Sequence, residues 1–198
     1  MRPGAKAFVL AVCLLAVSTS AHAFRFSVGA FGGLNMPIAQ EDTESGTVFG
    51  VKGRVPLIGF LAVEPNFTYV KNGDAEVEVG GNWNETMTHQ GGKYNSFGVD
   101  LVLGNVLGYK GFGMYGIFGL SSAKFQKDGI PDLTKSTYWL GLGFEYSVTD
   151  QISVDFRGKA FIFPYEDDTE NAPNPDLKTS RKNGMVTVGL NYYFGFTE

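Results

Sequence analysis

The chain ends with the sequence TVGLNYYFGFTE, residues 187–198. In this stretch Val188, Leu190, Tyr192 and Phe194 occupy every second position, and this period of two predicts a β-strand with one apolar face. Most chain ends are frayed and polar, so an apolar final strand requires something that covers it. The meaning of this strand therefore depends on whether the rest of the chain carries the same pattern.

The same alternation recurs along the whole sequence, and no convincing period of 3.6 accompanies it. Most of the alternating segments are close to the ~9–11 residues that a tilted strand needs to cross a bilayer. The eight segments are 24–36, 47–55, 60–70, 94–104, 111–125, 136–148, 152–163 and 185–194.

The connections between these segments alternate between long and short. The long ones are polar and cover residues 37–46, 71–93, 126–135 and 164–184, whereas the short ones are PLIG (56–59), residues 105–110 and TDQ (149–151). Outer-membrane barrels show this order, because their loops lie outside the cell and their turns lie in the periplasm. The pattern favours such a barrel over a soluble sandwich.

Each segment has one apolar and one polar face. In residues 152–163, Ile152, Val154 and Phe156 alternate with Asp155 and Arg157. Only residues 111–125 are ambiguous, because apolar side chains occupy both faces. Alternation alone also fits a secreted, water-soluble barrel or sandwich that is apolar inside. Aromatic residues near the segment ends, where membrane girdles form, favour lipid: Phe24, Tyr69, Tyr138, Tyr146, Tyr165 and Tyr192. We predict an all-β fold, an eight-stranded antiparallel up-and-down transmembrane β-barrel.

If the apolar face points outward, the polar face lines the interior. The charged positions on that face are Arg25, Lys52, Arg54, Arg157 and Lys159, with Glu64, Asp100, Glu145 and Asp155. Eight strands leave an interior just wide enough for side chains to fill it, and an unpaired ion there costs several kcal/mol. The near balance of sign predicts a closed, salt-bridged interior. A narrow, porin-like channel lined by charge is the alternative.

Glycines also lie on the polar face, and we expect them to leave room for long arginine and lysine side chains. These positions are Gly98, Gly141, Gly143 and Gly189.

The final strand also carries a spacing of special interest. Thr187-x-Gly189-x-x-Tyr192-x-Phe194 resembles the C-terminal β-signal that the outer-membrane assembly machinery recognises. The final aromatic of that signal is usually the last residue, whereas residues 195–198 follow here, so a frame that ends on Phe196 stays open. In a barrel, this strand pairs with the first strand, which explains why it is not frayed.

The chain from residue 24 to residue 198 resembles the OmpA/OmpX-type family of small eight-stranded outer-membrane barrels, which includes opacity-like and Ail-like proteins. The resemblance depends on pattern, size and the C-terminal signal. It implies a Gram-negative outer membrane and a role in envelope integrity, adhesion or contact with a host surface. The implied partners are outer-membrane lipid, lipopolysaccharide and the outer-membrane assembly machinery.

Residues 1–23 have the pattern of a Sec signal peptide. Arg2 and Lys6 precede the apolar stretch 7–17, and Ala21-His22-Ala23 forms a small-x-small cleavage site,. Removal of these two positive residues changes the net charge from −4 to −6. This acidic balance, with no cluster of Lys and Arg, argues against nucleic acid as a partner. We expect residues 24–198 to form one exported barrel domain.

Residues 71–93 form the most informative connection. Glu76 and Glu78 alternate with apolar residues, Gly80-Gly81 offers a turn, and residues 83–89 are able to run back. We expect a hairpin that rises above the membrane and offers a strand edge to a host or cell-surface protein. A solvated loop without a partner is an equal alternative. Asn72-Gly73 is a second turn signal, which leaves a count of ten strands open.

No residue pattern indicates catalysis, a cofactor or a metal centre. The acidic runs 40–44 and 166–170 have no EF-hand spacing, although clustered oxygens would suit divalent cations that bridge lipopolysaccharide phosphates. His89 is the only histidine after residue 23, and the His-x-Ser pattern of lipid A deacylase barrels is absent because Gly91 occupies that place. We expect a protein without enzyme activity or cofactor that acts through its outer loops.

Overall fold

Long, strictly alternating strands dominate the computed structural model, which describes residues 25–38, 44–78, 86–89, 91–104, 111–127, 130–162 and 182–195. Aromatic and β-branched residues on one side of each strand favour this extended backbone. The strands are β1 (Phe26–Ile38), β2 (Glu44–Ile58), β3 (Leu61–Gly73), β4 (Ala75–Glu78), β5 (Thr86–His89), β6 (Lys93–Gly104), β7 (Gly111–Lys127), β8 (Ile130–Ser147), β9 (Ile152–Ile162) and β10 (Lys182–Phe194).

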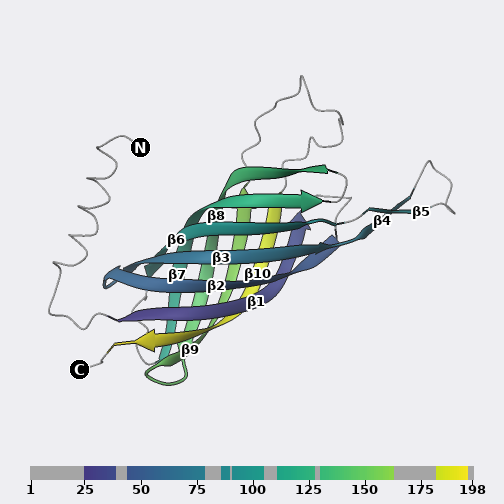
Figure 1. Cartoon of the computed structure of the whole chain (residues 1–198). Helices are drawn as coiled ribbons and strands as arrows, with labels where there is room; N and C mark the ends of the chain where they lie inside the picture. The colour runs from purple at the N-terminus through teal and green to yellow at the C-terminus, as the bar shows by residue number, and fades with distance from the viewer. Residues whose placement is uncertain are drawn as a thin grey trace, which may run out of the picture.

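Eight of these strands form one closed antiparallel barrel in the order β1-β10-β9-β8-β7-β6-β3-β2 (Figure 1). Strands β4 and β5 form a separate two-stranded sheet that projects from one end of the barrel. The predicted eight-stranded antiparallel barrel is therefore confirmed, and the two additional strands belong to a hairpin outside it.

The barrel closes where the end of the chain meets its beginning. Strand β10 pairs with β1 in an unbroken register from Phe26 opposite Phe194 to Ile38 opposite Lys182. The rings of Phe26 and Phe194 stack with their centroids 4.9 Å apart. The final strand thus has its partner, as expected from its apolar face.

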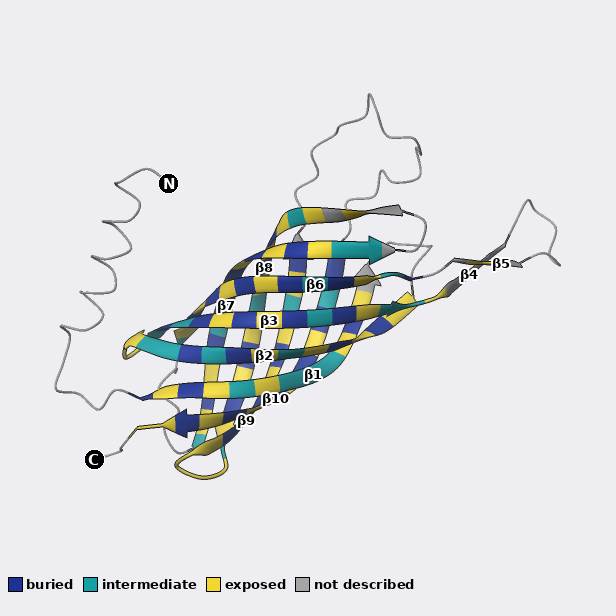
Figure 2. Cartoon of the chain, viewed as in Figure 1, coloured by how far each residue is buried: buried dark blue, intermediate teal, exposed yellow. Residues whose placement is uncertain are grey.

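The two faces of the wall differ in the way the alternation predicts (Figure 2). Outward positions carry exposed apolar side chains, such as Leu190 at 60% and Leu142 at 61%, whereas Asp155 and Glu64 on the inner face are fully buried. The ambiguous strand is β7, in which Met114 and Phe118 point outward while Tyr115 and Ile117 are buried inside. A water-soluble barrel would have the opposite arrangement.

Several strands are longer than the alternation predicted. The expected polar loop at 126–135 is wrong, because β7 continues to Lys127 and β8 starts at Ile130. The apolar pattern stops where the strands leave hydrocarbon, but the hydrogen-bonded ladder continues into water. An ion pair of 2.7 Å between Lys124 Nζ and Asp132 Oδ2 links the two strands there.

The turns also differ in detail. Strand β2 extends through most of the predicted PLIG turn, and the chain reverses at Gly59-Phe60 instead. The predicted TDQ turn is present, and Thr149 Oγ1 accepts hydrogen bonds from the backbone N–H groups of Gln151 and Ile152 at 3.2 and 2.9 Å. Asn72-Gly73 is not a turn, because β3 includes both residues and the chain continues into β4.

Some predictions concern residues outside the described ranges. These include the signal peptide at 1–23, the turn at Gly80-Gly81, the short turn at 105–110, the girdle residues Phe24 and Tyr165, the acidic run 166–170 and most of the run 40–44. Among the described residues, no helix is long and apolar enough to cross a membrane.

Because the outward apolar side chains face lipid, the stability lost when one is replaced by a charged residue should depend strongly on its depth in the bilayer. Leu142 lies between Tyr138 and Tyr146 on the outer face of β8, so Leu142→Arg should lower the free energy of unfolding by ~2–4 kcal/mol,. The matched variant Ser136→Arg, on the same face nearer the loops, should cost only ~0–1 kcal/mol,. Urea titration of the barrel in phospholipid vesicles measures both, and equal effects would contradict this orientation.

Candidate functional site

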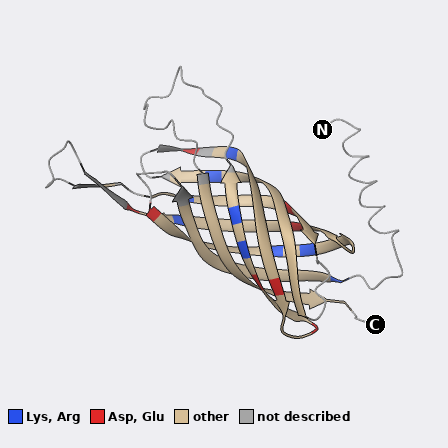
Figure 3. Ribbon diagram, turned by 180° about the vertical axis from the view of Figure 1, so that it is seen from behind, with Lys and Arg blue, Asp and Glu red and all other residues tan. Residues whose placement is uncertain are grey.

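The predicted interior charges come from several strands of the barrel, and Figure 3 shows charged positions on these ribbons. All nine lie on barrel strands or directly before β1, and eight of them take part in ion pairs between side chains. Most of these pairs join strands that are distant in sequence. They form two groups, a continuous network around Glu64 and a smaller group around Asp100.

Glu64 on β3 is the centre of the larger network. Its carboxylate, which is fully buried, accepts a hydrogen bond of 3.0 Å from Arg54 Nε on the neighbouring strand β2. Arg157 reaches it from β9 with both terminal nitrogens, and its Nη2 lies 2.9 Å from Glu64 Oε2. One carboxylate thus holds two guanidinium groups, which balances most of the cost of burying them.

Asp155 extends the network on β9. It accepts from Lys52 Nζ on β2, from Arg157 Nε at 2.5 Å and from the Tyr115 hydroxyl at 2.9 Å. The contact with Lys52 connects two strands on opposite sides of β1 and β10. This carboxylate therefore ties the charged interior across the seam at which the barrel closes.

Glu145 on β8 is the third buried carboxylate of the network. Arg54 Nη1 donates to it at 2.5 Å, and the hydroxyl of Tyr193 donates at 2.5 Å. Ser153 and Asn191 also donate to its Oε1 atom. Arg54 therefore lies between Glu64 and Glu145, so the network runs through a chain of alternating charge.

The smaller group is built on Asp100 of β6. Trp139 Nε1 donates to one of its oxygens at 2.7 Å, and Lys159 Nζ lies 2.7 Å from the other. Arg25 lies nearer the turns, where it donates to the backbone carbonyl of Asp150 and stands over the ring of Tyr193 at 4.5 Å. Each predicted charge therefore has a polar partner in the barrel.

Aromatic rings inside the barrel support the cations, and the sequence analysis did not include them in the site. Arg54 and Arg157 lie 5.0 and 5.4 Å from the centre of the Tyr115 ring, and Lys159 lies 5.2 Å from that of Trp139. Such contacts stabilise a desolvated cation. The period-two alternation could have identified these rings in the sequence. Tyr115, Trp139 and Tyr193 alternate with outward-facing residues on their strands, which places them on the inner face.

The inner glycines make room, but mostly not for lysine and arginine. A Cβ atom on Gly98 would lie 2.7 Å from the Trp139 ring, and one on Gly143 would collide with Tyr115. Gly189 faces Asp155, and of the four predicted glycines only Gly141 lies against a lysine stem, that of Lys159. The predicted glycines do leave room on the inner face, but the side chains beside them are mainly aromatic rings and not arginine or lysine.

Apolar and aromatic side chains fill the part of the interior nearer the loops. Tyr94 and Phe125 pack with ring centres 5.1 Å apart, and Trp139 and Phe161 pack at 5.3 Å. Val48 and Val70, near the loop ends of β2 and β3, are fully buried beside them. The lumen thus contains an ionic region toward the turns and an apolar region toward the loops.

The residues of the predicted β-signal are divided between the two faces of β10. Thr187 and Gly189 face the interior, whereas Tyr192 and Phe194 are each 40% exposed on the outer face. The strand ends at Phe194, and Gly195 follows with φ of 112°. Its geometry agrees with the frame that ends on Phe194, and the recognition role stays a prediction.

The hairpin is the second candidate site, and it forms between β3 and β6 as the alternation of residues 75–79 indicated. Strands β4 and β5 pair from Ala75 opposite His89 to Glu78 opposite Thr86. At the base, the Asn72 N–H donates to the Gly92 carbonyl at 3.0 Å, and Asp74 Oδ1 accepts from the Gly91 N–H at 2.9 Å. These bonds anchor the hairpin to the barrel rim.

Within the described ranges, no group of three or more His, Cys, Asp or Glu side chains is placed to hold a metal ion. The clustered carboxylates of the interior are instead neutralised by arginine and lysine. His89 belongs to β5, in the hairpin.

Comparison with known proteins agrees with the architecture. The profile of the outer membrane protein beta-barrel domain family matches residues 7–194. The chain belongs to this family. A search of curated proteins found no match to the sequence.

Solved structures show the same fold at low sequence identity. Neisserial surface protein A is 15% identical with a TM-score of 0.62, covering 85% of this chain and 97% of its own. A major outer membrane protein from Thermus thermophilus is 16% identical with a TM-score of 0.58, covering 87% and 100%. The N-terminal barrel domain of Pseudomonas aeruginosa OprF is 15% identical with a TM-score of 0.53, covering 87% and 100%. At such identities the likeness concerns the fold alone.

The central carboxylate should be essential for stability. Glu64→Gln leaves the guanidinium groups of Arg54 and Arg157 without their shared anion, so the free energy of unfolding should fall by ~3–5 kcal/mol,. Denaturant titration in vesicles measures this change. Asp132→Asn, which removes an exposed ion pair, is the control and should leave the midpoint unchanged,. A midpoint that Glu64→Gln does not shift would contradict the role of the network.

Proposed function

We propose that this outer-membrane barrel is a structural and surface-interaction protein, active in adhesion or envelope integrity through its outer loops, with a lumen that conducts neither ions nor solutes. The observation that carries the proposal is the filled interior. Cross-wall ion pairs such as Glu64–Arg157 and Lys52–Asp155 occupy its width, and Tyr94 and Trp139 lie on the loop side of them. A protein of this kind needs no catalytic group and no cofactor.

The rival function is a narrow channel for small polar solutes or ions. A selective pore requires charge of one sign that faces water, whereas eight of the charges here neutralise one another at close range. An ion that crossed would also pass the aromatic pairs Tyr94–Phe125 and Trp139–Phe161. Both features favour a closed barrel.

Conductance separates the two functions. The refolded barrel, inserted in a planar lipid bilayer, should show no steady openings in concentrated potassium chloride, because buried, ion-paired side chains occupy an interior only wide enough for side chains,. The amount of inserted protein is checked by protease resistance in vesicles of the same lipid. Reproducible, salt-dependent openings from fully inserted protein would favour the channel and reject the closed lumen.

We propose that the hairpin of β4 and β5 provides the interaction surface. In the described part of the chain each of these strands pairs only with the other, so each has an unpaired backbone edge. Such an edge is able to accept a strand from a partner protein on a host or cell surface. The base bonds of Asn72 and Asp74 hold the edge at a defined position above the barrel.

Binding to cells tests the hairpin. Vesicles that carry the protein should bind to cultured cells and to matrix proteins, and Val77→Pro should reduce binding about tenfold because proline removes a backbone N–H of β4 and weakens the hairpin strand that would pair with the partner. Val77→Thr, which keeps a β-branched side chain, is the matched control and should bind normally. Heat-dependent gel mobility shows that both barrels are folded. Unchanged binding by Val77→Pro would reject the edge as the binding surface.

Export and assembly complete the proposal. Residues 1–23 act as a Sec signal peptide, so the mature chain begins at Phe24,. Thr187, Gly189, Tyr192 and Phe194 then act as the signal for the outer-membrane assembly machinery. The exposure of Tyr192 and Phe194 on the outer face of β10 supports this role, since they are accessible to a protein partner before lipid covers them.

A further inference from the structure

The hydrogen-bonded wall of the barrel is interrupted between β2 and β3. Their pairing stops at Lys52 and resumes at Val55, and in the interval Pro65 lies opposite Gly53. The register of β3 with β6, on its other side, continues unbroken through Pro65. Proline has no backbone N–H, so the donor that is missing at residue 65 is one that would face β2. The carbonyl of Gly53 therefore lacks its partner in the ladder.

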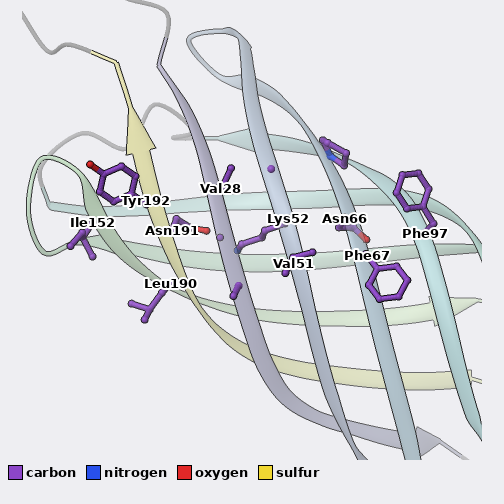
Figure 4. A pocket seen from close by; sticks show the side chains of 14 residues that line it. Val28, Val51, Lys52, Asn66, Phe67, Phe97, Ile152, Leu190, Asn191 and Tyr192 are labelled. Atoms are coloured by element: carbon purple, nitrogen blue, oxygen red, sulfur yellow. The ribbon is translucent and has the colours of Figure 1, made fainter.

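An apolar groove lies over this interruption on the outer face of the barrel (Figure 4). It has a volume of about 730 Å³, and both Gly53 and Pro65 line it. Among the described residues, no donor from outside the ladder reaches the Gly53 carbonyl. An unpartnered carbonyl is costly in hydrocarbon, and acyl chains have no donor to offer. The groove therefore favours an occupant that brings a hydrogen-bond donor.

A hydrogen-bond donor lies at one end of the same groove. Tyr192 on β10 stands there beside Ile152, and Tyr192 is 40% exposed on the outer face. Within the described ranges, its hydroxyl makes no hydrogen bond. On β1, Val28 is opposite Tyr192 on one side and opposite Gly53 on the other. The phenol donor and the incomplete carbonyl thus lie one strand from β1 in opposite directions.

This arrangement is complementary to itself under a two-fold axis. Two copies of an outer-membrane barrel share one orientation in the bilayer, so the axis of a symmetric pair is the membrane normal. With β1 at the axis, the β10 side of one copy faces the β2 side of the other, because an isologous interface exchanges the two sides. The Tyr192 hydroxyl of each copy then faces the partner's Gly53 carbonyl.

The shape of this wall also suits a second copy. At its centre, the outward residues of β1 are short, namely Val28, Ala30 and Gly32. Longer apolar side chains stand on the flanks, where Phe97 is 67% exposed and Leu190 is 60% exposed. The two-fold axis places the Leu190 flank of one copy against the Phe97 flank of the other. In lipid, transmembrane segments associate through small residues that let backbones approach and through hydrogen bonds.

We propose that the chain forms a parallel, two-fold symmetric dimer in the membrane, with β1 at its centre and the wall of each copy seated in the groove of the other. The Tyr192 hydroxyl of each copy donates to the partner's Gly53 carbonyl. These complementary partial charges favour a second copy over acyl chains, which supply no donor. Both loop ends then lie on the same side of the membrane, so two β4–β5 hairpins are presented together, an advantage in avidity that rests on the proposed function.

Energy transfer between differently labelled barrels, measured while lipid is added to phospholipid vesicles, tests the hydrogen bond. Pro65→Ala supplies the missing N–H to Gly53, and Tyr192→Phe removes the donor but keeps the ring. Each should weaken the dimer about tenfold, because each removes two symmetry-related hydrogen bonds. The double variant should be no weaker than either single variant, since both remove the same bonds. Tyr146→Phe, an exposed tyrosine of β8 outside the groove, is the control and should associate normally.

A second pair of variants tests the groove. Gly53→Leu fills it, and the added side chain meets no atom closer than 3.7 Å at its Cβ position. Gly158→Leu is the matched control, an outward glycine of β9 that does not line the groove and has open space around it. Gly53→Leu should weaken the dimer at least tenfold, because the walls are then unable to approach closely, whereas Gly158→Leu should not change it.

Disulfide cross-linking tests the position of the axis. Residues 24–198 contain no cysteine, so a single introduced cysteine forms a dimer only with its own copy in a second chain. Val28→Cys lies on the row that joins donor and acceptor and should cross-link readily on mild oxidation in vesicles. Met114→Cys, an exposed position on β7, is the control, because β7 lies four strands from β1 in either direction. It should stay monomeric.

Each arm is able to overturn the proposal. A wild type that stays monomeric at high protein-to-lipid ratio would show that lipid covers the groove. Unchanged association of Pro65→Ala and Tyr192→Phe would exclude the hydrogen bond, and equal effects of Gly53→Leu and Gly158→Leu would exclude the groove. Cross-linking that is equal at residues 28 and 114 would indicate random collision. Heat-dependent gel mobility shows that each variant is folded before its association is compared.

Discussion

The structure depends on the pairing of β1 with β10. In hydrocarbon an unpaired backbone N–H or carbonyl costs several kcal/mol, so a sheet is stable there only when it has no edge. The unbroken register from Phe26–Phe194 to Ile38–Lys182 removes both edges at once. Closure then fixes which side chains face the lipid and which are confined inside, and the ionic network, the aromatic packing and the outer groove all follow from that division.

The narrow interior explains why charged and aromatic side chains pack together inside the barrel. A core of eight strands has no space for bulk water, so each charge needs a partner in contact. Glu64, Asp155 and Glu145 provide anions on three strands, while Tyr115 supports Arg54 and Arg157 from the side. Gly98 and Gly143 leave room for the rings of Trp139 and Tyr115, which lie on other strands. The packing of side chains in the lumen reflects charge matching and volume matching together.

Alternation was sufficient to predict the barrel, the eight strands and the inward set of charges, because side-chain parity is a local property. It failed at the rims, since residues 126–127 and 130–135 belong to a polar stretch but still pair as strand. It could not identify the partners: Lys52 and Asp155 are 103 residues apart, and their meeting depends on the tilt and stagger of the closed sheet. The roles of Trp139 and Tyr115 were missed because only charged residues and glycines were considered on the inner face, and the face of residues 111–125 was left ambiguous. The missing ladder bond at Pro65 required the register of β3 with both of its neighbours.

The long reach of the interior pairs has a consequence for the order of folding. Arg54–Glu145, Glu64–Arg157 and Lys52–Asp155 join positions 91, 93 and 103 residues apart, and contacts of such separation form late because the loop-closure entropy must be met first. A nascent chain that ends before β9 has neither Asp155 nor Arg157 to offer to Lys52 and Glu64. Completion of the cylinder is therefore a cooperative final event, and the half-made wall must be sheltered from water and from other chains until the C-terminus arrives.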